Sequence, residues 1–392
     1  MANPSSVQLF FEGDDFFDAL LRDIGSARRS VLIEFYIFEY EIWGVTLLQK
    51  LRQISKFSKV KVRLLVDGIG SRSSLPAISQ YVKDSNIELN VFKPVSLFSM
   101  FRSGMHRRNH RKIVLIDRRI AYVGGMNVKD EHSQKLVGDI RWRDTMMRIE
   151  RTEKNHRFFR SLFAGMVFLF QSVLLGVYPL SPAKLWKVKT KSVRSKTVLR
   201  RRLSQWYKRA ELTQPHLYTT LFRRDRARYR SNYFELLRAA KRRIFLCSPY
   251  FIADLRLLRL LRAKAKEGVD VRVLTAGRTD VLTARQAGRS TYGFLLKSGV
   301  RIYEMSHRVF HAKQSIIDDS ALVGSGNLDY RSFLHNQEVM VHCRDIRTVR
   351  SLLVQWGKDV NESDEIEFAI WRRRSLWQKV NEKLCYGFRY YL

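Results

Sequence analysis

Acidic side chains are scarce in this sequence. Its 392 residues include 37 Asp and Glu against 72 Lys and Arg, which leaves a formal net charge of +35. This excess goes far beyond what solubility requires and indicates a polyanionic partner, either a nucleic acid or an anionic membrane surface. Charge alone does not distinguish between these two classes of partner.

Cysteine is also rare, since only Cys247, Cys343 and Cys385 occur, without the spacing of a metal or redox motif. The first two lie in apolar runs that suggest core strands, and we expect a reducing compartment. The start of the chain, Met1 to Gln8, lacks the basic residues and apolar run of a secretory signal. With 45% hydrophobic and 28% charged residues, the composition is that of a globular protein with room for two domains.

One eight-residue pattern, His-x-Lys-x4-Asp, occurs twice. Residues two apart on an extended chain point to the same face, so each copy is a strand that carries an imidazole beside an ammonium, with apolar residues buried below. Each copy is followed by a glycine-containing turn and an asparagine, Gly125 and Asn127 in the first half and Ser325 and Asn327 in the second. The two patterns comprise His110, Lys112 and Asp117, and His311, Lys313 and Asp318.

The repetition extends beyond these motifs. Residues 30–38 and 60–67 are β-branched and aromatic runs typical of buried strands, and a helical pattern lies between them. The same alternation returns at residues 243–250, 255–266 and 269–274. We therefore predict a duplicated α/β unit, with a largely parallel sheet covered by helices in each half.

The twin motifs with their Gly/Ser-x-Asn turns resemble the phospholipase D superfamily. The stretch 324–333, followed by Asn336-Gln337-Glu338, is similar to bacterial cardiolipin synthases, as are residues 108–112 and 142–144. The resemblance covers nearly the whole chain, and it implies a short form without the N-terminal transmembrane helices of larger members. It also implies two α/β/α sandwich domains related by a pseudo-twofold axis, with one active site at their interface. We expect domains at 1–183 and 213–392, joined by a basic linker at 184–212.

Histidine suits phosphoryl transfer because a neutral imidazole can attack phosphorus while a second, protonated imidazole supplies a proton to the departing alkoxide. The two lysines and two asparagines would surround the non-bridging phosphate oxygens. By analogy with the family, His110 is the nucleophile and His311 the general acid, although the pseudo-symmetry permits the reverse. A hydroxyl on Ser325 could donate to phosphate where Gly125 cannot, which would make the halves unequal.

In this superfamily a carboxylate that follows each motif fixes the imidazole. Glu338 occupies this position after the second motif, and Asp144 is offered by the first half, with different spacing. The resemblance gives Asp117 and Asp318 a structural role, gripping backbone or basic groups. The remaining histidines match no motif and lack clustered carboxylate or cysteine partners, so we expect neither a metal nor a cofactor. Glu34 lies within an apolar strand, where it needs a cation at the sheet edge, either in a structural ion pair or in the site.

Residues 161–183 contain no charged side chain. This stretch is long enough for a bilayer span, which takes about 20 residues. A span would place the two motifs on opposite sides of the membrane, and both flanks are basic, so we reject it. We expect a helix that begins in the core and emerges near residues 173–180 as an element that dips into the membrane. A fully buried helix with a loop is the alternative.

Basic and aromatic residues then dominate two segments. Residues 184–202 contain nine Lys and Arg, near Trp186 and Trp206, which is typical of a surface for anionic headgroups. Residues 371–377 and 388–391 combine Trp, Tyr and Phe with Arg and suit an amphipathic interfacial helix.

The leading functional hypothesis is phosphatidyl transfer, in which two phosphatidylglycerol molecules are joined through a phosphohistidine and glycerol is released. Hydrolysis by a phospholipase D would use the same residues. A nuclease would suit the charge but not the apolar stretch, and an inactive scaffold is opposed by the intact motifs. We expect a peripheral or monotopic protein on the cytoplasmic face of the bacterial inner membrane, recruited by phosphatidylglycerol and other anionic phospholipids.

Overall fold

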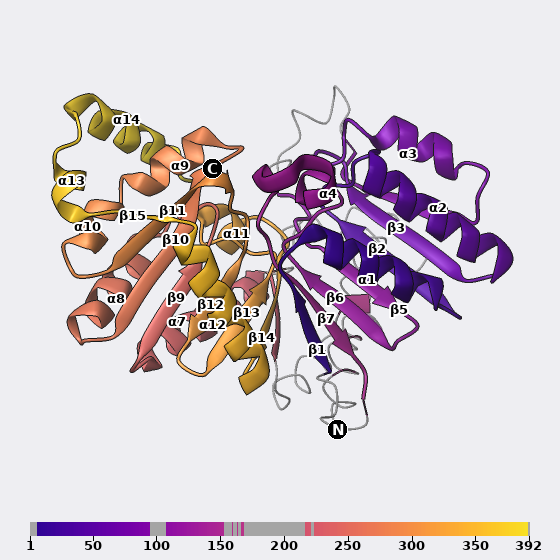
Figure 1. Ribbon diagram of the computed structural model, residues 1–392, viewed down its shortest axis with the longest axis horizontal. Helices are drawn as coiled ribbons and strands as arrows, with labels where there is room; N and C mark the ends of the chain where they lie inside the picture. The colour runs from indigo at the N-terminus through magenta and orange to yellow at the C-terminus, as the bar shows by residue number, and fades with distance from the viewer. Residues whose placement is uncertain are drawn as a thin grey trace, which may run out of the picture.

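The computed structural model describes residues 6–94, 107–152, 159, 163, 166–167, 216–220 and 223–390. Figure 1 shows two halves side by side, the first in indigo and magenta and the second in salmon to yellow, each with a sheet flanked by helices. The duplication predicted from the motifs is therefore present in the fold.

The first half contains a seven-stranded sheet in the order β1-β7-β6-β5-β2-β3-β4. Strands β2, β3 and β4 are parallel, and the other neighbours pair antiparallel. The elements are β1 Val7–Phe10, α1 Gly13–Gly25, β2 Ser30–Phe35, α2 Ile42–Phe57, β3 Lys61–Asp67, α3 Leu75–Val82, β4 Ile87–Phe92, β5 Ile113–Ile116, β6 Ile120–Gly124, α4 Gln134–Val137 and β7 Met146–Glu150.

The second half has the sheet order β15-β11-β10-β9-β12-β13-β14-β8. Its parallel strands β9, β10 and β11 correspond to β2, β3 and β4 of the first half. The elements are β8 His216–Thr219, α7 Arg223–Ala239, β9 Arg243–Cys247, α8 Leu255–Lys266, β10 Asp270–Arg278, α9 Leu282–Arg289, α10 Tyr292–Leu296, β11 Arg301–Val309, β12 Gln314–Ile317, β13 Ser320–Gly324, α11 Tyr330–Leu334, β14 Val339–Cys343, α12 Ile346–Asn361, β15 Asp364–Glu365, α13 Phe368–Arg372 and α14 Leu376–Gly387.

Both sheets are mixed, not largely parallel as the alternation of strands and helices predicted. The difference arises at each motif, where β5 and β12 pair antiparallel with β2 and β9 and then turn back in a tight hairpin, β5 to β6 and β12 to β13. The histidine and lysine of each motif come just before these strands and do not lie on them, contrary to the prediction. A hairpin joins antiparallel strands with only a short turn and no crossover helix. The parallel part of each sheet thus ends where the motif begins.

The motif aspartates build these hairpin turns. Asp117 and Asp318 have φ values of 53° and 48°. The Asp117 carboxylate accepts backbone N–H bonds of 2.6 to 2.8 Å from residues 28–30. Asp318 accepts equivalent bonds of 2.9 to 3.0 Å from residues 241–243. Both contacts fit the structural role expected for these aspartates, because each clamps the start of β2 or β9 to the motif hairpin.

A shared core holds the halves together. It combines side chains from β5 to β7 with others from β9 to β14 and from α12. Phe159, Phe163 and Met166 are buried in it, so the uncharged stretch begins inside the core as predicted. The expected membrane-dipping part at 173–180 and the basic run at 184–202 lie outside the described residues. Within the described ranges, no helix is both long and apolar enough to cross a bilayer.

Candidate active site

The two motifs meet where the halves exchange backbone hydrogen bonds. The N–H of His110 donates to the carbonyl of Gln337 at 3.0 Å, and the N–H of His311 donates to the carbonyl of Arg143 at 2.7 Å. Each motif histidine is therefore hydrogen-bonded to the residue just before the carboxylate of the other half. This exchange brings together residues that are more than one hundred positions apart in the chain.

The carboxylates cross over between the halves. Glu338, from the second half, has both oxygens 3.1 Å from Nδ1 of His110, in the first half. Asp144, from the first half, has Oδ2 2.5 Å from Nδ1 of His311. The sequence identified both carboxylates but did not assign them to the opposite histidine. Because Nδ1 of each ring faces a carboxylate, Nε2 is the nitrogen available to phosphorus.

Both motif lysines are buried beside their histidines. Nζ of Lys112 donates to the carbonyl of His110 at 2.8 Å, and Nζ of Lys313 lies 2.6 Å from Nδ1 of His311. Burial lowers the pKa of Lys112 to about 7, with a further contribution from the charge of Lys313. Burial also lowers the pKa of Lys313 to about 8. The two ammonium groups are close enough to repel each other, and a bound anion would stabilise the charged form of both.

Burial favours neutral imidazoles in the site. It lowers the pKa of His110, against the pull of the Glu338 charge, and with Lys313 it lowers the pKa of His311 to about 4. Burial alone would raise the pKa of both carboxyl groups, but the charges of Lys313 and His311 hold the pKa of Asp144 below its usual value. For Glu338 the opposing charges are those of His110 and Lys112, and its pKa is also lowered. Both carboxylates are therefore ionised and can accept an Nδ1–H bond.

Ser325 supports the Glu338 carboxylate. Its buried hydroxyl donates to Oε2 of Glu338 at 2.6 Å. Ser332 donates to the other oxygen, Oε1, at 2.9 Å, and Thr220 accepts the backbone N–H of Glu338 at 2.7 Å. Sequence reasoning missed Ser332 and Thr220. Ser332 lies in the stretch that carried the family resemblance, whereas nothing in the sequence around Thr220 indicated its partner.

The motif asparagines are buried, and one of them already has a backbone partner. Oδ1 of Asn127 accepts the N–H of Ile37 at 3.1 Å, which fixes the chain after β2. The N–H of Asn127 donates to Nε2 of His132 at 3.3 Å, and the N–H of Asn327 donates to the Ser332 hydroxyl at 3.1 Å. His132 was treated as an ordinary histidine, but the structure places it in the support of this turn.

Aromatic rings stand against both imidazoles. Tyr36 packs edge-on to His110 with ring centroids 4.8 Å apart, and Nζ of Lys112 lies 5.4 Å from the Tyr36 ring. Trp142 packs against His311 at 5.2 Å. These rings restrict the imidazoles to one orientation and exclude water from their sides, and the sequence did not assign either ring to the site.

Glu34 meets a cation, as expected, but on the interior strand β2 and not at a sheet edge. Its Oε1 accepts from Nε of Arg111 at 2.8 Å and from Nδ2 of Asn109 at 2.7 Å, and the ion pair is fully buried. Arg111 and Asn109 flank His110 on either side. Both alternatives for Glu34 therefore apply. It forms a structural ion pair, and through Asn109 and Arg111 it fixes the backbone around His110.

One group of carboxylates among the described residues has the spacing of a metal site. Ligand atoms of Glu39, Glu41 and Glu131 lie within 4.8 Å of one another. The Nζ of Lys129 lies 3.4 Å from Glu39 and 2.8 Å from Glu131, so two of the three carboxylates already have a protein cation as partner. We therefore assign no metal to it.

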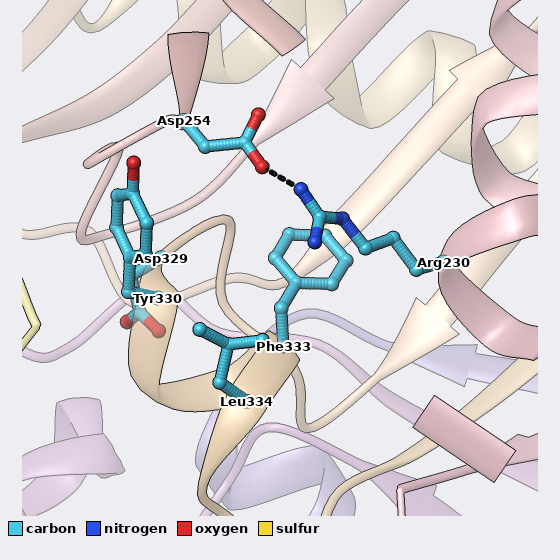
Figure 2. A pocket seen from close by; sticks show the side chains of 6 residues that line it. All are labelled: Arg230, Asp254, Asp329, Tyr330, Phe333 and Leu334. Atoms are coloured by element: carbon cyan, nitrogen blue, oxygen red, sulfur yellow. Dashed lines mark hydrogen bonds and ion pairs between the residues drawn. The ribbon is translucent and has the colours of Figure 1, made fainter. Parts of the chain in front are cut away.

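A small crevice lies beside α11, shown in Figure 2. It has about 20 Å³ of space for water, room for little more than one molecule. Figure 2 shows Arg230 directed at Asp254 across this crevice. The space is too small for a lipid headgroup, so we place no substrate there. The lining residues are Arg230, Asp254, Asp329, Tyr330, Phe333 and Leu334.

Two crossed histidine and carboxylate pairs at the interface of a duplicated α/β fold define an enzyme of the phospholipase D class. The family model described as "Cardiolipin synthase, PLD-like domain" matches residues 20–140 and 233–358. The chain therefore belongs to this family.

Known cardiolipin synthases align with nearly the whole length of this chain. The chain is 28% identical to cardiolipin synthase 1 of Bacillus cereus over 386 residues, covering 97% of this chain and 71% of that protein. It is 26% identical to the cardiolipin synthase of Listeria innocua over 383 residues, with 97% and 74% covered. Among solved structures, phosphatidylserine synthase of Haemophilus influenzae matches with a TM-score of 0.66 at 13% identity, covering 100% of this chain and 96% of that one.

Proposed function

We propose that this chain is a phosphatidyltransferase that joins two phosphatidylglycerol molecules into cardiolipin and releases glycerol. The observation that carries the proposal is the pair of His–carboxylate contacts, crossed between the halves, in a chain similar to cardiolipin synthases over 97% of its length. Each imidazole in the site therefore has a carboxylate at Nδ1 and an available Nε2. The proposed reaction transfers a phosphatidyl group twice, and it needs one imidazole as the nucleophile and one as the proton donor and acceptor.

In the first step, Nε2 of one histidine attacks the phosphorus of phosphatidylglycerol. We assign His110 as this nucleophile. The negative charge of the bound phosphodiester opposes the effect of burial on His311, so this imidazole takes up a proton when the substrate binds. The P–O bond to the glycerol headgroup breaks, the His311 imidazolium gives its proton to the departing alkoxide, and glycerol leaves. A phosphatidyl group is then bonded to Nε2 of His110, while Glu338 stabilises the positive charge that the ring acquires during the attack.

In the second step, a headgroup hydroxyl of another phosphatidylglycerol attacks the phosphorus. His311, now neutral, accepts the proton of this hydroxyl, the P–N bond breaks, and His110 returns to its starting state. Two phosphatidylglycerol molecules have then become one cardiolipin and one glycerol. No proton is gained or lost over the cycle.

The lysines supply the stabilisation of the transition state. A five-coordinate phosphorane carries more charge on its non-bridging oxygens than the diester does, and preorganised cations in a buried site stabilise this difference. Lys112 and Lys313 are the buried cations beside the two histidines. Asn127, Asn327 and their glycine-containing turns complete the proposed phosphate pocket.

We further propose that the enzyme works as a peripheral or monotopic protein on the cytoplasmic face of the bacterial inner membrane. The substrate class supports this location, because phosphatidylglycerol is itself an anionic membrane lipid. The net charge of +35 and the basic run at 184–202 favour such a surface.

The decisive experiment is lipid analysis of a cardiolipin-deficient bacterium that expresses this chain, together with the purified enzyme acting on phosphatidylglycerol. We expect cardiolipin to appear and glycerol to be released in equal amounts. The double variant His110→Ala, His311→Ala is the control and should give neither product. Release of glycerol with phosphatidic acid and no cardiolipin would replace the transferase by a hydrolase.

A further inference from the structure

Helix α14 is attached to the protein by polar and aromatic contacts. Glu382, which is 3% exposed, forms ion pairs with Arg374 and, at 3.6 Å, with Arg289 of α9. Cys385 and Tyr386 pack against a small apolar cluster, and the Tyr386 hydroxyl donates to the carbonyl of Ala253 at 3.3 Å. Figure 1 shows α14 lying alongside α9 at the outer upper side of the second half.

The opposite face of α14 is apolar and exposed. At 3.6 residues per turn, its side chains form one stripe on the side of the helix away from Glu382. This outward stripe is the reverse of the usual arrangement, in which the apolar side of a helix packs on the core. The stripe consists of Leu376 (79% exposed), Trp377 (77%), Val380 (47%), Leu384 (61%) and Phe388 (65%).

The preceding tryptophan does not belong to this stripe. Trp371, which the sequence placed in an interfacial segment, is 5% exposed and stacks on Tyr292 with centroids 5.1 Å apart. The Arg374 guanidinium lies 3.2 Å from its ring centroid. The prediction for Trp371 is therefore wrong, because this ring anchors the segment to the core. Within residues 371–377, the exposed apolar surface begins at Leu376.

The charges around the stripe are all positive. Between residues 372 and 390 the sequence has Arg372, Arg373, Arg374, Lys379, Lys383 and Arg389, but Glu382 is the only acidic residue. Since Glu382 is buried in its ion pairs, the helix presents no exposed carboxylate. An apolar stripe bordered by lysine and arginine fits the surface of an anionic bilayer, where each cation near the headgroups contributes about 1 kcal/mol.

A series of contacts leads from α14 towards the catalytic groups. The ring of Tyr390, just after α14, contacts that of Tyr330 at 4.7 Å, and Tyr330 follows the motif residue Asn327 by three positions. Asp280, in the loop before α9, acts electrostatically on His311 and accepts the hydroxyl of Tyr250 at 2.5 Å. These contacts link the inner face of α14, through Tyr250 and Asp280, to the surroundings of His311.

We propose that the outward stripe of α14 inserts into the boundary between headgroups and acyl chains of an anionic bilayer and holds the phosphate site at its surface. This inference deepens the proposed function and rests on it for the identity of the substrate. It names a docking surface at residues 376–388, in a different part of the sequence from the basic run at 184–202. The stripe supplies the apolar part of the attachment, and its arginines and lysines supply the electrostatic part.

The test uses the full chain with Trp377, Leu384 and Phe388 all changed to Gln. The matched control carries Phe57→Gln, Ile346→Gln and Val354→Gln, three exposed apolar residues on α2 and α12 (76%, 51% and 64% exposed). Binding is measured by co-sedimentation with phosphatidylserine vesicles, which contain no phosphatidylglycerol. High ionic strength screens the attraction of the basic run.

We expect the stripe variant to bind at least about tenfold more weakly, since it loses three apolar side chains from the interface, while the control binds like wild type. Turnover of short-chain, monomeric phosphatidylglycerol should be equal in all three proteins. Unchanged vesicle binding by the stripe variant would overturn the proposal. So would loss of self-association without loss of vesicle binding, because the stripe would then be an interface between two copies. Vesicle binding with no cardiolipin formed would contradict only the proposed reaction.

Discussion

Gly125 lies so close to Asp144 that a Cβ at this position would overlap the Asp144 carboxylate. In the other half the equivalent residue is Ser325, and its hydroxyl donates to Glu338. The two half-sites therefore use different pairs, a glycine with the shorter aspartate and a serine with the longer glutamate. The first half has a glycine where the second has a serine because the Asp144 carboxylate fills the space that a side chain at position 125 would need.

We predict that Gly125→Ala reduces kcat by at least about tenfold, because the methyl group displaces Asp144 and with it the ring of His311. Gly357→Ala, on α12 and away from the site, is the control, since nothing lies within 4 Å of a Cβ there. Steady-state turnover of dispersed phosphatidylglycerol measures both variants. Equal activities for the two would show that Asp144 can move without consequence.

Loss of either motif histidine should abolish product formation while the fold is retained. His110→Ala removes the proposed nucleophile and His311→Ala the proposed proton donor, and neither role has a second candidate in the site. The control is His307→Ala, whose side chain is 48% exposed and lies outside the motifs. Circular dichroism checks the fold, and substantial turnover by either motif variant would rule out the mechanism with two histidines.

The crossed pairing makes a prediction that can be checked residue by residue. Glu338→Gln should change the ¹⁵N shifts of the His110 ring and leave those of His311 unchanged, whereas Asp144→Asn should do the opposite. Each substitution should lower kcat by about 10² to 10⁴, since an amide no longer stabilises the imidazolium. A change in the histidine of the same half would contradict the crossed arrangement.

The lysines should set the alkaline limit of activity. Their pKa values are lowered to about 7 for Lys112 and about 8 for Lys313, so each is charged below its pKa and neutral above it. As the pH rises through this window, the site loses the cations that stabilise the phosphorane, and kcat/KM should fall. Because a bound phosphodiester favours the ammonium form, the fall in kcat should occur at higher pH. A kcat/KM that stays constant through this window would refute the assignment.

The buried ion pair between Arg143 and Asp359 should control stability. The guanidinium contacts both carboxylate oxygens at 2.7 Å, and neither side chain is exposed. Asp359→Ala should lower the free energy of unfolding by about 3 to 5 kcal/mol, because it leaves Arg143 buried without its counter-charge.

The surface pair of Arg301 and Glu365 gives the matched control for this measurement. Its side chains are 46% and 40% exposed, so Glu365→Ala should cost at most about 1 kcal/mol. Urea denaturation of both variants measures the difference. Similar losses for the two would mean that the halves do not depend on the buried pair.

The sequence by itself determined the features that depend on residues close together in the chain. The spacing of His, Lys and Asp in each motif, the repeated strands and helices, and the acidic candidates Glu338 and Asp144 were all visible without a structure. Periodicity showed the repeated strands and helices, because it places neighbouring residues on predictable faces, whereas the family resemblance pointed to Glu338 and Asp144. The resemblance also implied the structural role of Asp117 and Asp318.

Only the tertiary structure decided which groups meet. His110 and Glu338 are 228 positions apart, and His311 and Asp144 are 167 apart, so no local pattern connects them. Whether Trp371 or Trp377 is buried likewise depends on which face of the segment docks on the second half, and that is fixed by Tyr292 and Arg289. Such contacts form only when separate elements pack together. The periodicity of one helix or strand shows which of its faces is apolar, but it does not show which other element packs against that face.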